Sequence, residues 1–161
     1  PVLFLEHKRT YRLVRQEMEG APAETVIGRA RVSRRGADLT IIAYGLMLHE
    51  SLAAAETLAG EGIEATVVDL LTLNPLDRET ILESAKATGK VLIVHEDTLT
   101  GGLGGEVAAI IAEHAFEYLD APIRRVAGPD IPPMPFHHAM EDFFMPNRHK
   151  IAAAARELAA Y

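Results

Sequence analysis

The amino-acid sequence predicts a three-layer α/β/α domain built on a mixed, mostly parallel five-stranded sheet. Short apolar runs of strand length alternate with amphipathic segments of about 11–14 residues, which is the pattern of βαβ units with parallel crossovers. The central apolar runs are nearly continuous, so helices are expected to cover these strands on both faces. The 161 residues correspond to about one domain.

Six segments have strand patterns. Residues 29–34 alternate between polar and apolar side chains, which is typical of a half-buried edge strand, whereas 39–44 and 65–70 are almost wholly apolar. The apolar run Val2–Leu5 is also a short buried-strand pattern, and residues 11–23 after it have no sustained period, which indicates a linker or arm. The predicted strands cover residues 2–5, 29–34, 39–44, 65–70, 90–95 and 122–127.

Four longer segments have helical spacing. Asp77 is expected to cap one of them and Gly89 to end it, while Gly60 and Gly62 end the helix before it. The acidic pair at 141–142 is typical of a helix or turn start. The predicted helices cover residues 47–58, 78–88, 106–119 and 148–160.

The composition excludes several classes of protein. Without cysteine, the chain has no disulfide framework, cysteine nucleophile or thiolate metal site. A net charge of −7 argues against a nucleic-acid binder, which needs a basic face. No apolar run approaches the ~18–20 residues of a membrane span, and no secretory leader pattern is present.

The start of the chain is unusual. It begins Pro1-Val2-Leu3-Phe4-Leu5, without an initiator methionine and with a strand pattern already under way at residue 2. We expect this segment to belong to a structure that begins upstream.

A glycine cluster at Gly101–Gly105 follows a predicted strand and opens a helix. Backbone N–H groups at such a position favour anions. The spacing does not match the G-x-G-x-x-G dinucleotide fingerprint, and no P-loop lysine follows. Two interpretations remain, a tight turn with close helix packing, which we favour, and an anion or partner contact.

Candidate catalytic groups are few. His95 and Glu96, followed by Asp97, come at the carboxyl end of a predicted strand, the edge where ligands bind in open sheets. His95 is a candidate general base, although we favour loop or interface roles for His95 and Glu96. No H-x-x-x-H or H-x-H spacing occurs, which argues against zinc. No serine lies in a G-x-S-x-G context.

Five stretches, in order and over nearly the whole chain, carry motifs of one known family. The stretches are 1–12, 27–45, 67–77 (VVDLLTLNPLD), 88–106 (TGK, HE, GGLGGE) and 119–130 (LDAPIRRV with Gly128 and Asp130). Together they resemble the C-terminal half of the β subunit of the thiamine-diphosphate-dependent 2-oxo acid dehydrogenase decarboxylase component. That half is a transketolase C-terminal-like domain. The chain departs from the family pattern at His7, Leu71 and Gly105.

The resemblance implies a division of labour. Residues 1–25 are expected to be the end of a preceding pyrimidine-binding domain plus a linker, and residues 26–161 the transketolase C-terminal-like domain. In this family thiamine diphosphate and magnesium are the cofactors of the whole enzyme, and the cofactor lies between the α subunit and the β subunit's N-terminal domain. The resemblance therefore assigns no catalytic, cofactor-binding or metal-binding residue to this chain. The segments 134–136 and 143–146 favour a branched-chain-like member.

The resemblance also implies an assembly role. The family uses this half for the β–β contact of an α₂β₂ heterotetramer and for docking the peripheral-subunit-binding domain of dihydrolipoyl acyltransferase. The acidic group near the "LDAP" turn corresponds to Asp120, and the terminal carboxylate to Tyr161 if that residue is the natural end. Glu117, about one helical turn earlier, adds charge. Complementary charge speeds encounter with a basic docking domain.

Two alternatives stay open from the sequence. One is the C-terminal domain of another transketolase-like enzyme, against which the 119–126 stretch argues. The other is a stand-alone anion- or nucleotide-binding α/β domain that uses Gly101–Gly105. As part of a 2-oxo acid dehydrogenase the protein is expected in the bacterial cytoplasm or, in a eukaryote, in the mitochondrial matrix.

Overall fold

A five-stranded mixed sheet forms the centre of the computed structural model, which describes residues 1–15, 17, 20, 25–132 and 136–161. Its strand order is β1-β3-β2-β4-β5. The strands are β1 (Arg31–Arg34), β2 (Leu39–Ala43), β3 (Ala65–Asp69), β4 (Val91–Thr98) and β5 (Arg124–Gly128). Only β1 runs antiparallel to its neighbour, and the other pairs are parallel. The predicted fold class, a mostly parallel five-stranded α/β/α domain, is confirmed.

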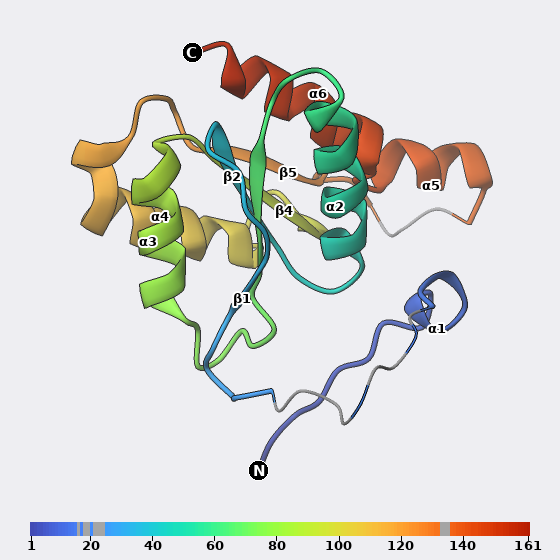
Figure 1. Cartoon of the computed structure of the whole chain (residues 1–161). Helices are drawn as coiled ribbons and strands as arrows, with labels where there is room; N and C mark the ends of the chain where they lie inside the picture. Colours follow the sequence, from blue (N-terminus) through green and yellow to red (C-terminus); the bar gives the residue numbers. More distant parts are fainter. Residues whose placement is uncertain (16, 18–19, 21–24, 133–135) are drawn as a thin grey trace.

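Helices cover both faces of the sheet, as the continuous apolar strands require (Figure 1). One face packs against α2 (Leu46–Ala59) and α6 (Arg148–Ala159), with Leu58 and Ile151 fully buried between the layers. The other packs against α3 (Arg78–Thr88) and α4 (Leu103–Ala115), with Ile81 and Ile111 fully buried. All five residues of β2 and of β3 are buried.

The helix boundaries follow from local chemistry. Asp77 caps α3 by accepting a hydrogen bond from the Thr80 backbone N–H at 3.1 Å, and Gly89 ends the helix in the left-handed region at φ 65°. At the start of α6, the Asn147 side chain accepts hydrogen bonds from the backbone N–H groups of the second and third residues of the helix. These two helices begin where the sequence predicts them to begin.

The predicted strand at Val2–Leu5 is wrong. The segment makes no strand pairing within the described residues, and its four side chains are 76–84% exposed. An apolar run forms a strand only where a neighbouring strand accepts its hydrogen bonds, and no described strand lies beside it. The expected linker at 11–23 falls partly on residues outside the description, although its first residues belong to the single-turn helix α1 (Thr10–Leu13).

Several elements in the second half of the chain differ from the sequence prediction. β4 continues to Thr98, past the predicted end at residue 95. The long helix α4 ends at Ala115 and gives way to a 3₁₀ turn, η1 (Phe116–Tyr118), which leaves Tyr118 47% exposed rather than on the apolar face. A short helix, α5 (His138–Phe144), occupies the region of the predicted acidic helix or turn start.

Candidate functional site

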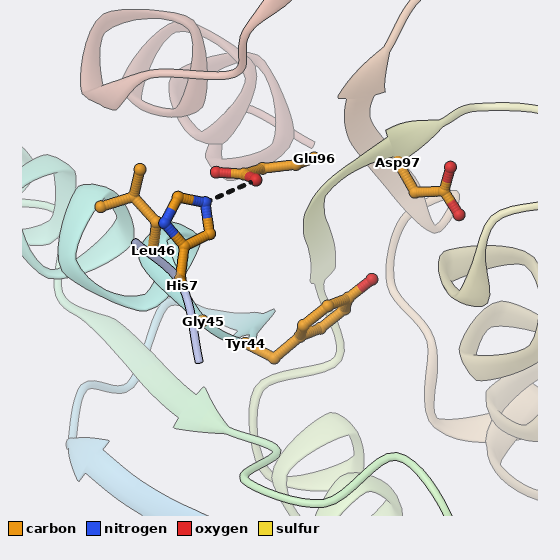
Figure 2. A pocket seen from close by; sticks show the side chains of 6 residues that line it. All are labelled: His7, Tyr44, Gly45, Leu46, Glu96 and Asp97. Carbon is orange, nitrogen blue, oxygen red and sulfur yellow. Dashed lines mark hydrogen bonds and ion pairs between the residues drawn. The ribbon is translucent and has the colours of Figure 1, made fainter. Parts of the chain in front are cut away.

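A pocket lies at the carboxyl ends of β2 and β4. The chain leaves β2 towards β3 on one side and returns to β4 on the other, which makes this the topological switch point of the sheet, where ligands bind in open α/β folds. The cavity has a volume of about 230 Å³. Figure 2 shows its lining from three segments distant in sequence. The lining residues are His7, Tyr44, Gly45, Leu46, Glu96 and Asp97.

One polar contact joins the N-terminal segment to this pocket. His7 Nε2 lies 3.0 Å from Glu96 Oε2, and His7 Nδ1 accepts a hydrogen bond from the Arg9 backbone N–H at 3.3 Å (Figure 2). Because Nδ1 is an acceptor, the neutral ring with its proton on Nε2 satisfies both contacts, with Nε2–H donating to the carboxylate. The other carboxylate oxygen, Glu96 Oε1, is buried and has no hydrogen-bond partner among the described residues.

The electrostatics of the pocket are acidic. Burial raises the pKa of the Tyr44 phenol, and the carboxylates of Asp97 and Glu96 raise it further. The carboxylates of Glu96 and Asp97 in the lining disfavour direct contact with an anionic ligand. Within the described parts of the chain no group of three or more histidine, cysteine, aspartate or glutamate side chains could hold a metal ion.

His95 lies in the core and not at a loop or interface, so the favoured sequence interpretation of this residue is wrong. It is fully buried in β4 and stacks on the Tyr44 ring, with centroids 6.5 Å apart and an interplanar angle of 8°. Neither ring nitrogen has a hydrogen-bond partner among the described residues. Burial lowers the pKa of His95 while the Asp97 carboxylate opposes the change, so the ring is neutral at physiological pH. It is absent from the pocket lining, which argues against the general-base interpretation.

The glycine cluster packs against His95. A Cβ on Gly102 would lie 2.7 Å from His95 Cε1, and one on Gly104 would lie 2.6 Å from His95 Cδ2. Gly101 has φ 79°, a left-handed conformation that glycine adopts without strain. The imidazole thus fills the space beside the first turn of α4. This arrangement supports the tight-turn interpretation over the anion-binding one.

The predicted partner-binding residues lie at the opposite, amino edge of the sheet. Glu117, Asp120 and Tyr161 are all exposed, and we call them the amino-edge acidic surface. The Asp120 backbone N–H donates to the Gly89 carbonyl at 2.8 Å, and Lys90 Nζ donates to the carbonyl of Ala159, near the end of α6, at 2.8 Å. At the same edge Arg124, at the start of β5, pairs with Glu157 of α6 at 3.2 Å.

The structure therefore brings the Asp120 turn and the end of α6 to one edge, through neighbouring residues at the junction of α3 and β4. The local sequence marks Gly89 only as the residue that ends α3, and it does not mark Lys90. A lysine that reaches an α6 carbonyl 69 residues away leaves no local sequence signal.

This fold, with a switch-point pocket at one edge of the sheet and an acidic surface at the other, defines a transketolase-like α/β domain. A family model described as "Transketolase, C-terminal domain" matches residues 28–151. The chain belongs to this family.

Several proteins named as β subunits of 2-oxo acid dehydrogenases are similar to the chain. It is 55% identical over 161 residues to the 2-oxoisovalerate dehydrogenase subunit beta of Bacillus subtilis, covering 100% of the chain and 49% of that protein. It is 44% identical to the pyruvate dehydrogenase E1 component subunit beta of the same organism, over 98% of the chain and 48% of that protein. A mitochondrial pyruvate dehydrogenase E1 β subunit of Dictyostelium discoideum is 38% identical over 98% of the chain and 45% of that protein. The chain spans about half the length of these relatives.

Solved structures agree on the fold. A split-gene transketolase described as an inactive β4 tetramer superposes with a TM-score of 0.76 at 33% identity, over 90% of this chain and 46% of that one. A 2-oxoglutarate:ferredoxin oxidoreductase from Magnetococcus marinus superposes with a TM-score of 0.54 at 14% identity, over 81% of this chain and 19% of that one, and shows the fold alone. Among the described helices, none is long and apolar enough to cross a membrane.

Proposed function

We propose that the chain is the assembly domain of a 2-oxo acid dehydrogenase β subunit and does not itself carry the catalytic groups. In the parent enzyme a 2-oxo acid is oxidatively decarboxylated with thiamine diphosphate, and the acyl group passes to a lipoyl group. Thiamine diphosphate and magnesium belong to that parent enzyme, and the acidic switch-point pocket of this segment is not their site. Residues 26–161 form the assembly domain, and residues 1–25 belong to a preceding domain and its linker.

The observation that carries this proposal is the amino-edge acidic surface. Asp120 contacts Gly89, and the end of α6 contacts the next residue, Lys90, so the exposed Asp120 turn and the end of α6 lie together at one edge. A basic docking domain is the partner whose charge complements this arrangement. We propose the peripheral-subunit-binding domain of dihydrolipoyl acyltransferase as that partner.

The similarity to β subunits supports the wider assembly. The relatives are named as β subunits, one of them of an E1 component, and we propose an α subunit and a second β subunit as further partners. Both a bacterial and a mitochondrial relative are known, so we propose the cytoplasm in a bacterium or the mitochondrial matrix in a eukaryote as the location of the complex.

The docking proposal is tested with the full β subunit that contains this segment, assembled with its α subunit. Calorimetry measures the Kd of the purified acyltransferase binding domain for the wild type and for Asp120→Lys. The charge reversal should weaken binding about tenfold or more, with the loss shrinking as salt is added. Turnover of free 2-oxo acid with an artificial electron acceptor should not change.

A matched control is provided by Glu106, at the opposite end of α4 from the Asp120 turn. Glu106 is an exposed carboxylate in the first turn of α4, at the carboxyl edge, so Glu106→Lys makes the same change of net charge away from the docking surface. If both reversals weaken binding equally, the effect is one of net charge, and the assignment of Asp120 fails.

For the β–β contact we propose the exposed apolar face around α5. Met140 and Phe143, three residues apart on α5, are 56% and 69% exposed, and Phe136 just before the helix is 103% exposed. The helix projects from the body of the domain (Figure 1). The similar split-gene transketolase is described as a β4 tetramer, which supports a second copy as the occupant.

Light scattering of the full β subunit tests this contact. Met140→Glu places a charge within this face and should shift the population towards smaller species. Glu141→Gln, one residue away, serves as the control and should leave the oligomeric state unchanged. A Met140→Glu protein with the wild-type mass distribution would rule out this face as the contact.

A further inference from the structure

The Asp120 carboxylate rests directly against the backbone of Gly89. A Cβ built on Gly89 would lie 2.9 Å from Asp120 Cγ, still closer to Asp120 Oδ2, and 3.1 Å from the Tyr118 carbonyl oxygen. The space that a side chain would fill at position 89 is therefore occupied by the carboxylate. The same glycine accepts the Asp120 backbone N–H at 2.8 Å, so it holds both the main chain and the side chain of Asp120.

The surroundings of this contact are fixed by other elements. Gly89 is buried, and its N–H donates to the Ala85 carbonyl at 2.9 Å, which ties it to the last turn of α3. Lys86 Nζ, in the same turn, lies 4.8 Å from the centroid of the Tyr118 ring. This cation–π contact stabilises the η1 turn that leads to Asp120. The next residue, Lys90, binds the Ala159 carbonyl near the end of α6.

We infer that Gly89 is a positioning residue, which seats the Asp120 carboxylate against the end of α3 and beside the end of α6, so that a basic partner meets this carboxylate in one fixed orientation. This inference rests on the docking function proposed above. Gly89 bears no charge, so the distribution of charge on the surface does not identify it as part of the docking surface.

A side chain added at position 89 would displace the Asp120 carboxylate first. The two nearest atoms to the new Cβ are at the free end of the Asp120 side chain, which can rotate. The Tyr118 carbonyl oxygen, at 3.1 Å, needs to shift by only about a few tenths of an ångström. A residue with a Cβ at position 89 should therefore swing the carboxylate away and leave the fold intact. The exposed position of Asp120 gives the displaced side chain room in solvent.

Backbone strain has to be separated from this displacement, because Gly89 has φ 65°. Asparagine tolerates the left-handed region better than other residues with a side chain, so Gly89→Asn adds a Cβ with the least strain. Gly62 provides the reverse control, since it has φ 85° and a Cβ there would meet no atom within 4 Å. Gly62→Ala thus introduces the strain without displacing any carboxylate.

The experiment uses the full β subunit assembled with its α subunit and the purified acyltransferase binding domain as the probe. Calorimetry at two salt concentrations measures Kd for Gly89→Asn, Gly89→Ala, Gly62→Ala, Asp120→Ala and the double variant Gly89→Asn/Asp120→Ala. Both Gly89 variants should weaken binding about fivefold and reduce its salt dependence as Asp120→Ala does, while Gly62→Ala binds like the wild type. The double variant should bind no worse than Asp120→Ala, because Gly89 acts through that carboxylate.

The outcomes separate the two proposals. If Asp120→Ala binds like the wild type, the docking assignment fails and the positioning role fails with it. If Asp120→Ala weakens binding but Gly89→Asn does not, docking stands and the positioning role is wrong. Additive losses in the double variant also overturn it, since they mean that Gly89 acts by another route. Melting temperatures of all variants identify any that are misfolded, and Gly89→Asn decides the matter if Gly89→Ala does not fold.

Discussion

Lys150 connects α6 to α5, and its removal should release the shorter helix. Its ammonium donates to the carbonyl oxygens of Asp142, Phe143 and Met145, at 2.8, 2.7 and 2.8 Å. These carbonyls belong to the end of α5 and the residue after it, where the helix has no partners of its own for them. An ammonium has three N–H donors, so all three are used. Lys150→Met keeps the apolar stem and removes the donors.

The expected loss follows from the number and exposure of these bonds. A hydrogen bond contributes about 0.5–1.5 kcal/mol net, and the lower part of that range applies here because two of the three bonds are exposed. Burial lowers the pKa of Lys150, which shows that desolvation offsets part of the gain. Three bonds therefore contribute about 1–2 kcal/mol. Seven residues do not form a stable helix alone, so the loss should appear as local opening of α5.

Hydrogen exchange measured by mass spectrometry tests this expectation. In Lys150→Met, peptides covering α5 should exchange about tenfold faster, the change that corresponds to about 1.4 kcal/mol, while peptides from α2 keep their protection. Lys86→Met is the matched control, because it removes one lysine whose ammonium lies over the Tyr118 ring and bonds to no carbonyl of α5. Equal protection of α5 in both variants would refute the reasoning.

Three further predictions concern buried polar groups. Burial lowers the pKa of His95 below its ordinary value of 6.5, so the folded state resists protonation and the free energy of unfolding should fall as the pH drops through 6.5. Urea unfolding at pH 7.5 and pH 5 should show a smaller fall for His95→Leu than for the wild type. An equal fall in both proteins would contradict this. Burial raises the pKa of Asp69, and the nearby Arg31 guanidinium opposes this rise. Arg31→Met should therefore lower the free energy of unfolding by about 1 kcal/mol at neutral pH, and by progressively less as acid protonates Asp69. A loss of stability that does not depend on pH would contradict the pairing. Asp77→Ala should lower the free energy of unfolding in urea by about 1–2 kcal/mol, because it removes the side chain that caps α3 at Thr80. Asp77→Asn is the milder control, since asparagine also caps helices. An equal loss in both variants would contradict the capping role.

The sequence predicted those elements whose signals are local. The start of α3 follows from the Asp77 cap, its end from Gly89, and the buried strands β2 and β3 from continuous apolar runs. The helix α5 was not predicted as such, because it has seven residues and its end depends on Lys150 of another helix. Val2–Leu5 has the composition of a strand, but pairing needs a neighbour that composition does not specify.

The candidate sites divide in the same way. Asp120 was named from the LDAP motif and Glu117 from its place about one helical turn earlier, and the structure leaves both exposed, Glu117 in η1 and Asp120 just after it. The role inferred for Gly89 depends on a contact between residues 31 positions apart, which no local pattern encodes. His95 was predicted to have a loop or interface role from its place at a strand end, and the structure buries it because β4 continues to Thr98.

The length of β4 separates the contacts at the carboxyl edge of the sheet from those at the amino edge. Its eight residues span about 26 Å at ~3.3 Å per residue, with the His7–Glu96 contact towards one end and the Gly89–Asp120 contact just before the other. This strand acts as a rigid spacer in the middle of the domain. The Asp120 turn, for which a docking partner is proposed, therefore lies well away from the pocket at the carboxyl edge. Free-energy changes from substitutions at the two ends should therefore add, as is usual for sites that share no partner.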